Sequence, residues 1–274
     1  MKMKNNGRLA LSAFLTSVFC FLSSAHAEGP SSVYMQELTW QEIHTHLQSG
    51  STTVIIPTGA TEEEGPQLVT GTHNIVVRYA AGEIAKRLGN ALVAPVIAYA
   101  PSGRINPPEG NMQFPGTISV TPRAYSLILA DVARSLKQHG FHMICFLGDS
   151  QASQDVQAQV ANALTAEWSA DGVKVINVTN YFYNNGQDEW NDNTKIKVMN
   201  PAAHAGHIET SEMMSVDESG VRMTQLAPHT EHDYKTTGAA GDSSHATAEF
   251  GRRYVSLKIE AAVKQIQNAS GHAQ

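Results

Sequence analysis

The strongest constraint on the fold is a repeated alternation between short apolar runs and longer segments with helical spacing. The apolar runs are rich in β-branched residues and predict strands at residues 52–59, 91–100, 141–149 and 173–182. The longer segments carry apolar residues on one helical face and predict helices at residues 74–89, 121–140, 153–172 and 244–266. Because strands that alternate with helices form βαβ units, the sequence predicts an α/β fold with a mostly parallel sheet covered on both faces.

Residues 1–27 differ in character from the rest of the chain. Basic residues in the first eight positions precede an apolar run at 9–24, and the Ala-His-Ala triplet that follows fits a small-x-small cleavage site. This order is typical of a secretory signal peptide, so we expect one domain over residues 28–274 and an exported protein, periplasmic or secreted. The alternative is an uncleaved membrane anchor, because the apolar run is nearly long enough to span a bilayer.

Composition narrows the classes of partner. The formal net charge is −6, and three of the basic residues belong to the signal peptide. We therefore expect no nucleic-acid partner and no membrane contact after cleavage. Cys20 leaves with the signal peptide and Cys145 lies in an apolar run, which predicts a buried thiol and no intramolecular disulfide.

Polar residues follow the first and third predicted strands. Glu62, Glu63, Glu64 and then His73 come after the first strand, and Asp149 comes after the third. Ligands of open α/β sheets bind beyond the carboxyl ends of the strands, so these side chains are candidates for one metal site. In extended backbone Glu62 and Glu64 point to one side and Glu63 to the other. The alternative is a solvated surface turn.

A second cluster places His204, His207 and Glu209 within six residues. Histidine and glutamate this close together suit metal ligation or acid–base catalysis. The alternative is the start of a helix, where a glutamate complements the positive end of the helix dipole.

Three further residues are weaker candidates for substrate binding. Gln151 and Asn111 offer hydrogen bonds, although surface or capping roles are the usual ones for such residues. Arg104 lies in a Gly/Pro-rich loop and would suit a substrate carboxylate, while an exposed loop arginine is the alternative.

Four motifs, in order along the chain, give a resemblance to a known family. The stretches are "GATEEEGPQLVTGTH", "FPGTIS", "HAGHIETS" and "GAAGDSSHATAEFGRR". They resemble the motifs of the creatininase (creatinine amidohydrolase-like) family over nearly the whole length after residue 27. The resemblance implies a three-layer α/β/α sandwich, a homo-oligomer that is often a hexamer, and a two-metal centre that hydrolyses C–N bonds of small amides.

The chain departs from the family pattern at several ligand positions. Glu62 matches the family's glutamate ligand, but Glu64 stands where the family has histidine. His73 stands where the family has its metal-bridging aspartate, and Asp149 where it has histidine. His207 replaces a glutamate and is therefore a candidate substitute ligand.

His204 and Glu209 match the family residues. The resemblance implies that His204 transfers a proton, and we expect Glu209 or a backbone carbonyl group to orient it.

Two interpretations of these departures remain. In the first, ligand types are exchanged within the site, and Glu62, Glu64, His73 and Asp149 bind one or two divalent ions. A set so rich in carboxylates favours Mn²⁺, Fe²⁺ or Mg²⁺ over Zn²⁺. The protein would then be a metal-dependent hydrolase of a small, non-peptide amide or related C–N bond, cyclic amides included. In the second, the metal site is degraded and the scaffold binds a small ligand without catalysis.

Overall fold

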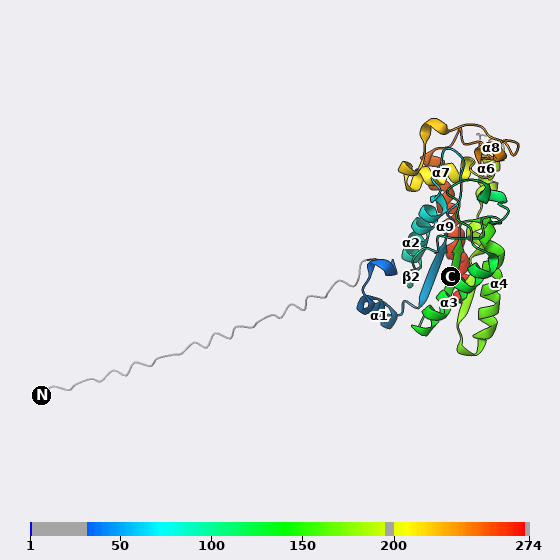
Figure 1. Cartoon of the computed structure of the whole chain (residues 1–274). Coiled ribbons are helices and arrows are strands. Elements are labelled where there is room, and N and C mark those ends of the chain that lie inside the picture. The colour runs from blue at the N-terminus through cyan, green and yellow to red at the C-terminus, as the bar shows by residue number, and fades with distance from the viewer. Residues whose placement is uncertain (2–31, 195–199, 272–274) are drawn as a thin grey trace.

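The computed structural model describes Met1 and residues 32–194 and 200–271 (Figure 1). The predicted cleavage site and nearly all of the predicted signal peptide lie outside these residues. The described elements, in chain order, are the 3₁₀ helix η1 (Met35–Glu37), α1 (Trp40–Gln48), β1 (Thr53–Thr58), α2 (Thr72–Leu88), β2 (Ala91–Val93), η2 (Gly110–Gln113), α3 (Pro122–Gln138), β3 (Met143–Gly148), α4 (Gln151–Glu167), η3 (Ser169–Asp171), β4 (Lys174–Asn177), α5 (Thr179–Phe182), α6 (Gln187–Asn193), α7 (His207–Val216), η4 (Glu218–Gly220), η5 (Met223–Gln225), α8 (Tyr234–Thr237) and α9 (Ala248–Ser270).

The described strands form one parallel sheet in the order β2-β1-β3-β4. β1 and β3 are the two central strands, paired from Thr53 with Met143 to Thr58 with Gly148. Every residue of these two strands is buried, which accounts for their continuous apolar character. The predicted α/β architecture with a parallel sheet is confirmed.

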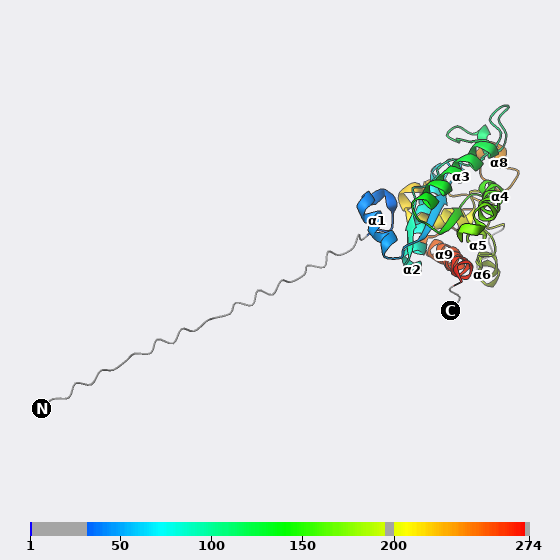
Figure 2. The same cartoon turned by 90° about the horizontal axis from the view of Figure 1, so that it is seen from below.

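Helices cover both faces of the sheet (Figure 2). On one face α3 and α4 pack on alternate residues of the strands, with Leu129 and Leu164 in the same core cluster as Ile56. On the other face α2 and α9 pack on the intervening residues, with Val77 and Ile259 clustered around Ile55. The strands therefore bury both faces, and the molecule has the three layers of an α/β/α sandwich.

Several predicted helix ends are found where the sequence signals place them. α2 is followed by Gly89 in the left-handed conformation, with φ 74°. α3 begins after Thr121, whose side chain accepts the N–H of Ala124.

Cys145 is buried in β3 as a free thiol. Within the described ranges, no helix combines the length and hydropathy needed to cross a bilayer.

Two strands are shorter than predicted. β2 ends at Val93, and Pro95, which cannot donate to a sheet ladder, lies just beyond it. The fourth predicted strand stops at Asn177, and the residues from Thr179 form the short helix α5. There the Asn180 N–H donates to the side chain of Gln265 on α9, so a distant contact replaces strand pairing.

Candidate metal centre

β1 and β3 end side by side, and this brings two polar loops to one edge of the sheet. The N–H of Asp149 donates to the carbonyl oxygen of Thr58 at 3.0 Å, directly after the last paired residues. The loop after β1 carries Glu62 to Glu64 and leads into the first turn of α2, where His73 lies. The two loops thus meet at the carboxyl edge of the sheet, where ligand sites of such folds occur.

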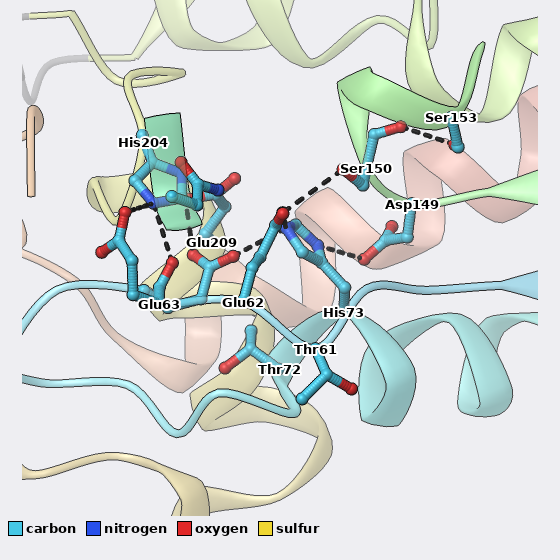
Figure 3. A network of polar contacts seen from close by, with 12 residues as sticks. Thr61, Glu62, Glu63, Thr72, His73, Asp149, Ser150, Ser153, His204 and Glu209 are labelled. Atoms are coloured by element: carbon cyan, nitrogen blue, oxygen red, sulfur yellow. Dashed lines mark hydrogen bonds and ion pairs between the residues drawn. The ribbon is translucent and has the colours of Figure 1, made fainter. Parts of the chain in front are cut away.

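His73 lies between three carboxylates, as Figure 3 shows in part. Its Nε2 is 2.7 Å from Oε1 of Glu64 and 3.3 Å from Oε1 of Glu62. Its Nδ1 is 3.1 Å from Oδ2 of Asp149. All four side chains are buried, so water screens these charges little. One imidazole therefore separates a pair of glutamates from an aspartate.

The pKa shifts of His73 and Glu62 show that the surroundings of the glutamates favour a positive charge. Burial lowers the pKa of His73, but the charge of Glu64, the hydrogen bond with Asp149 and the close contact with Glu62 outweigh it and raise the pKa well above the ordinary value. Burial raises the pKa of Glu62, but its hydrogen bond and charge interaction with His73 outweigh it and leave a pKa of about 2. A divalent cation would supply the same positive charge in place of the His73 proton.

Three groups fit a divalent cation. Oε2 of Glu62 and both carboxylate oxygens of Glu64 are buried without a hydrogen-bond partner, and the contact of Glu64 with Nε2 of His73 is an ion pair. Glu62, Glu64 and His73 each offer one ligand atom within 4.8 Å of the others. Octahedral coordination at about 2.1 Å puts neighbouring ligand atoms about 3.0 Å apart. The contacts of 2.7 and 3.3 Å to His73 Nε2 lie on either side of that value.

Asp149 occupies a different position from the one predicted for a direct ligand. It contacts the opposite nitrogen of His73, and its second oxygen, Oδ1, accepts from Nζ of Lys258 at 2.6 Å. Both of its oxygens are therefore engaged away from Glu62 and Glu64. A carboxylate on the second nitrogen of a ligating histidine orients the ring, which is an outer-sphere role.

Glu64 also belongs to a second cluster, with His204 and Glu209. Nε2 of His204 lies 3.0 Å from the carbonyl oxygen of Glu63 and 3.2 Å from that residue's Oε1. Nδ1 of His204 is 4.0 Å from Oε2 of Glu64. Glu63 thus faces His204, while Glu62 faces His73 and Glu64 contacts both histidines.

Burial and neighbouring charges shift the pKa values of this second cluster. Burial, and then the charge of Glu64, raises the pKa of Glu209 to about 8, although its Oε2 accepts the Ala205 N–H at 2.6 Å. Burial lowers the pKa of His204, but the charge of Glu64 and the hydrogen bond with Glu63 outweigh it and raise the pKa to about 10. The cluster can therefore hold and release protons close to the three-residue site.

A cavity of about 610 Å³ opens onto both clusters. Glu62, His73, His204 and Glu209 lie in its wall, as do the predicted substrate-binding residues Gln151 and Asn111. Asn111 is held there by Tyr234, whose hydroxyl group donates to Oδ1 of Asn111 at 2.5 Å. The volume suffices for a small organic ligand.

The structure does not bring Arg104 or His207 to this cavity's wall. Arg104 is half exposed, pairs with Glu109, and lines a separate hollow. His207 is buried against the rings of Phe250 and Tyr254 on α9, with ring centroids 5.1 and 5.8 Å away. Burial lowers its pKa to about 4, which keeps the ring neutral. Neither helix entry nor loop composition fixes where these side chains point, so the sequence could not place them relative to the cavity.

Sequence reasoning missed the groups that support the site. Ser150 donates to Oε1 of Glu62 at 3.3 Å, and Lys258 joins Asp149 to Glu212. Lys258 could have been found from its place on the apolar face of α9, next to Ile259. A lysine at such a position must be paired or else costs free energy.

Comparison with known proteins adds family relationships to this geometry. The model of a family described as creatininase, creatinine amidohydrolase, matches residues 36–266. A mycofactocin precursor peptide peptidase of Mycolicibacterium smegmatis is 27% identical over 234 residues, which cover 78% of this chain and 84% of the relative. The creatinine amidohydrolase of Pseudomonas putida is 24% identical over 205 residues, covering 72% of this chain and 77% of the relative.

Among solved structures, a crystal structure of creatinine amidohydrolase superposes with a TM-score of 0.73. It is 19% identical and the match covers 88% of this chain and 98% of that one, so the likeness concerns the fold. Related creatininase structures are described as a manganese form and as a Zn-Zn type of a mutant. Both metals are divalent, like the cation that the three-residue site fits.

Proposed function

Since the chain belongs to the creatininase family, we propose that it is a divalent-metal-dependent amidohydrolase that cleaves a C–N bond of a small amide. Glu62, Glu64 and His73 would hold the cation. The observation that carries this proposal is the set of buried Glu62 and Glu64 oxygens without hydrogen-bond partners, facing Nε2 of His73 beside a cavity. The carboxylate-rich set favours Mn²⁺, Fe²⁺ or Mg²⁺ over Zn²⁺.

A bound divalent cation supplies Lewis acidity towards the substrate carbonyl and lowers the pKa of water. His204 is the group suited to move the proton. Its Nε2 faces the Glu63 carbonyl oxygen, which only accepts, so Nε2 carries hydrogen and Nδ1 is the nitrogen free to exchange a proton. Glu209 lies in the same cavity wall with a pKa of about 8, and would share that proton with His204 near neutral pH.

The test combines metal analysis with hydrolysis of a panel of substrates. We expect stoichiometric divalent metal in the purified protein, loss of hydrolysis with EDTA, and recovery on adding Mn²⁺. Glu64→Gln should lower Mn²⁺ affinity by more than the ~10–100-fold typical of outer-sphere changes. Glu83→Gln, a change on the outer side of α2, is the matched control and should leave it unchanged. His204→Asn should still bind the cation held by Glu62, Glu64 and His73, but its turnover number should fall ~10²–10⁴-fold.

The panel decides the substrate class. Small cyclic amides are the proposed class, and short peptides are the second candidate because the mycofactocin relatives are named as peptidases of a precursor peptide. Hydrolysis of peptides alone would exclude the non-peptide substrate. A protein that stays free of metal yet binds a small amide would instead be a ligand-binding protein on this scaffold.

We also propose that the protein is exported to the periplasm or secreted after cleavage near residue 27, and that it assembles as a homo-oligomer, with a hexamer as the expected form. The basic start, apolar run and cleavage triplet support export. N-terminal sequencing and light scattering of protein expressed from the full chain test both points. An uncleaved N-terminus or a monomer would contradict them.

A further inference from the structure

A buried ammonium group lies behind His73, on the side away from the proposed cation. Nζ of Lys258 donates to Oδ1 of Asp149 at 2.6 Å and to Oε2 of Glu212 at 3.0 Å, and lies 4.5 Å from the ring centroid of Tyr181. Lys258 is 6% exposed, and Asp149 and Glu212 are each 3% exposed. Three charged side chains from α9, α7 and the end of β3 therefore meet out of water.

Stability alone does not account for this trio. Taking charges out of water costs free energy, and buried ion pairs are often no more stable than apolar residues of the same volume. Asp149 is the member that continues towards the site, because its Oδ2 contacts Nδ1 of His73. Lys258, Asp149 and His73 thus form a chain of contacts that ends at Glu62 and Glu64.

The direction of each hydrogen bond in this chain follows from the chemistry. An ionised carboxylate only accepts, so Asp149 requires a hydrogen on Nδ1 of His73. When the ring is neutral, Nε2 then carries the lone pair on the side of Glu62 and Glu64, where a cation would take the place of the second proton. Lys258 keeps Asp149 in place by holding its other oxygen, and it balances the carboxylate's charge in a region that excludes water.

We propose that Lys258 is a positioning residue that, through Asp149, fixes His73 in the Nδ1–H form and presents Nε2 to a divalent cation. The inference rests on the proposed function, since the cation is the one assigned to Glu62, Glu64 and His73. Lys258 and Asp149 lie outside the four family-like motifs. The inference also explains why a histidine and an aspartate are placed together: Asp149 serves the ring of His73.

The test compares two variants that isolate the Lys258–Asp149 contact. Glu212→Gln keeps this contact and replaces the second carboxylate partner of Lys258, which also accepts from Gln187, by a neutral amide. The double variant Lys258→Met with Glu212→Gln removes the ammonium and restores the wild-type net charge of the trio. We expect Glu212→Gln to bind Mn²⁺ within about twofold of wild type by isothermal titration calorimetry. We expect the double variant to bind ~10–100-fold more weakly, as outer-sphere changes do.

A double variant with native-like near-UV circular dichroism whose Mn²⁺ affinity stays within twofold of Glu212→Gln overturns the proposal, because Lys258 would then serve packing alone. A second measurement does not depend on the variants folding. In Zn²⁺-loaded wild-type protein, NMR of the His73 ring should show the proton on Nδ1, protected from exchange. A proton on Nε2 also overturns the proposal.

Failure of the proposed function gives a different result. If wild-type protein binds neither Mn²⁺ nor Zn²⁺, the metal assignment falls. The His73 Nδ1–H resonance of metal-free protein still reports on the contact chain: it should be protected from exchange in wild type and in Glu212→Gln. Its exchange in the double variant should be faster, and equal protection in all three proteins contradicts the role of Lys258.

Discussion

Glu63 and Glu64 are neighbours in the chain, yet their carboxylates serve different partners. Glu63 contacts Nε2 of His204, whereas Glu64 lies between His73 and His204. The two-residue period of an extended backbone separates Glu63 from its neighbours, so one short loop supplies ligands to one side and a histidine partner to the other. At this scale, residue order alone sets which group faces the cation.

The protonation of Glu209 and His204 makes the stability of the metal-free protein depend on pH. Each has a higher pKa in the folded protein, so each stabilises the fold below its unfolded pKa and loses that contribution as pH rises through the folded pKa. The windows are 4.5 to about 8 for Glu209 and 6.5 to about 10 for His204. We expect the Tm of metal-free protein, measured by calorimetry, to fall from pH 6.5 to pH 8.

Glu209→Gln is the control for this pH dependence. It removes the contribution of Glu209 and reduces that of His204, whose pKa the charge of Glu209 helps to raise, so the decline of Tm over the same interval should be shallower. A wild-type Tm that stays constant or rises between these pH values would contradict the raised pKa values.

The sequence predicts the candidate ligands better than it predicts their roles. Glu62, Glu64 and His73 converge as expected, because strand order and backbone period place them. The role of Asp149 was not predictable, since it depends on Lys258, which lies 109 residues further along the chain. A motif describes residues near one another in sequence and carries no information on such a partner.

At the scale of elements, the contact between α7 and α9 holds two supports of the site together. α7 carries Glu209 and Glu212, and α9 carries Lys258. A Cβ atom added to Gly251 of α9 would lie 1.7 Å from the carbonyl oxygen of Ser211 on α7. The absence of a side chain at Gly251 therefore sets how closely the two helices approach.

Gly251→Ala should force α7 and α9 apart. We expect a loss of about 1–3 kcal/mol in the free energy of unfolding, as overpacking of a tight contact typically costs, measured by urea denaturation. Gly71→Ala is the matched control, because nothing lies within 4 Å of its added Cβ and its φ is −94°. Equal stabilities of the two variants would show that the helices do not depend on this contact.

Some element boundaries follow from local sequence signals and others do not. The ends of α2 and α3 follow from Gly89 and Thr121, which act within one helical turn. The fourth strand ends at Asn177, where the side chain of Gln265 on α9 donates to the Asn177 carbonyl oxygen and accepts the Asn180 N–H. The β-branched run there is a correct local signal that a distant contact overrides.

At the scale of the whole molecule, the cation should hold the loop after β1 against the first turn of α2. A ligand that binds only the folded protein stabilises it by about 2.7 kcal/mol at a hundred times its dissociation constant. We therefore expect Mn²⁺ to raise the Tm of EDTA-treated protein in a thermal-shift titration. Glu64→Gln should abolish this rise and Glu83→Gln should retain it. An equal rise in both variants would place the metal elsewhere.

The overall architecture was predictable because it depends on patterns repeated along the chain. Alternating strands and helices give the parallel sheet, and buried β1 and β3 account for its centre. Segments without such a pattern were not predicted, as with α1, or only as an alternative, as with the helix start at residues 204–209 that is the beginning of α7. Their positions depend on packing against elements distant in sequence, as α7 does against α9.

The place of α9 in the chain has a consequence for synthesis. Glu62, Glu64 and His73 emerge early from the ribosome, but Lys258 belongs to the last helix, which packs against α2 and α7. A nascent chain stalled before α9 would carry the metal-binding side chains without the group that orients the histidine. Only chains whose translation has finished would then bind the ion tightly. Products of a premature stop codon before α9 would bind it weakly.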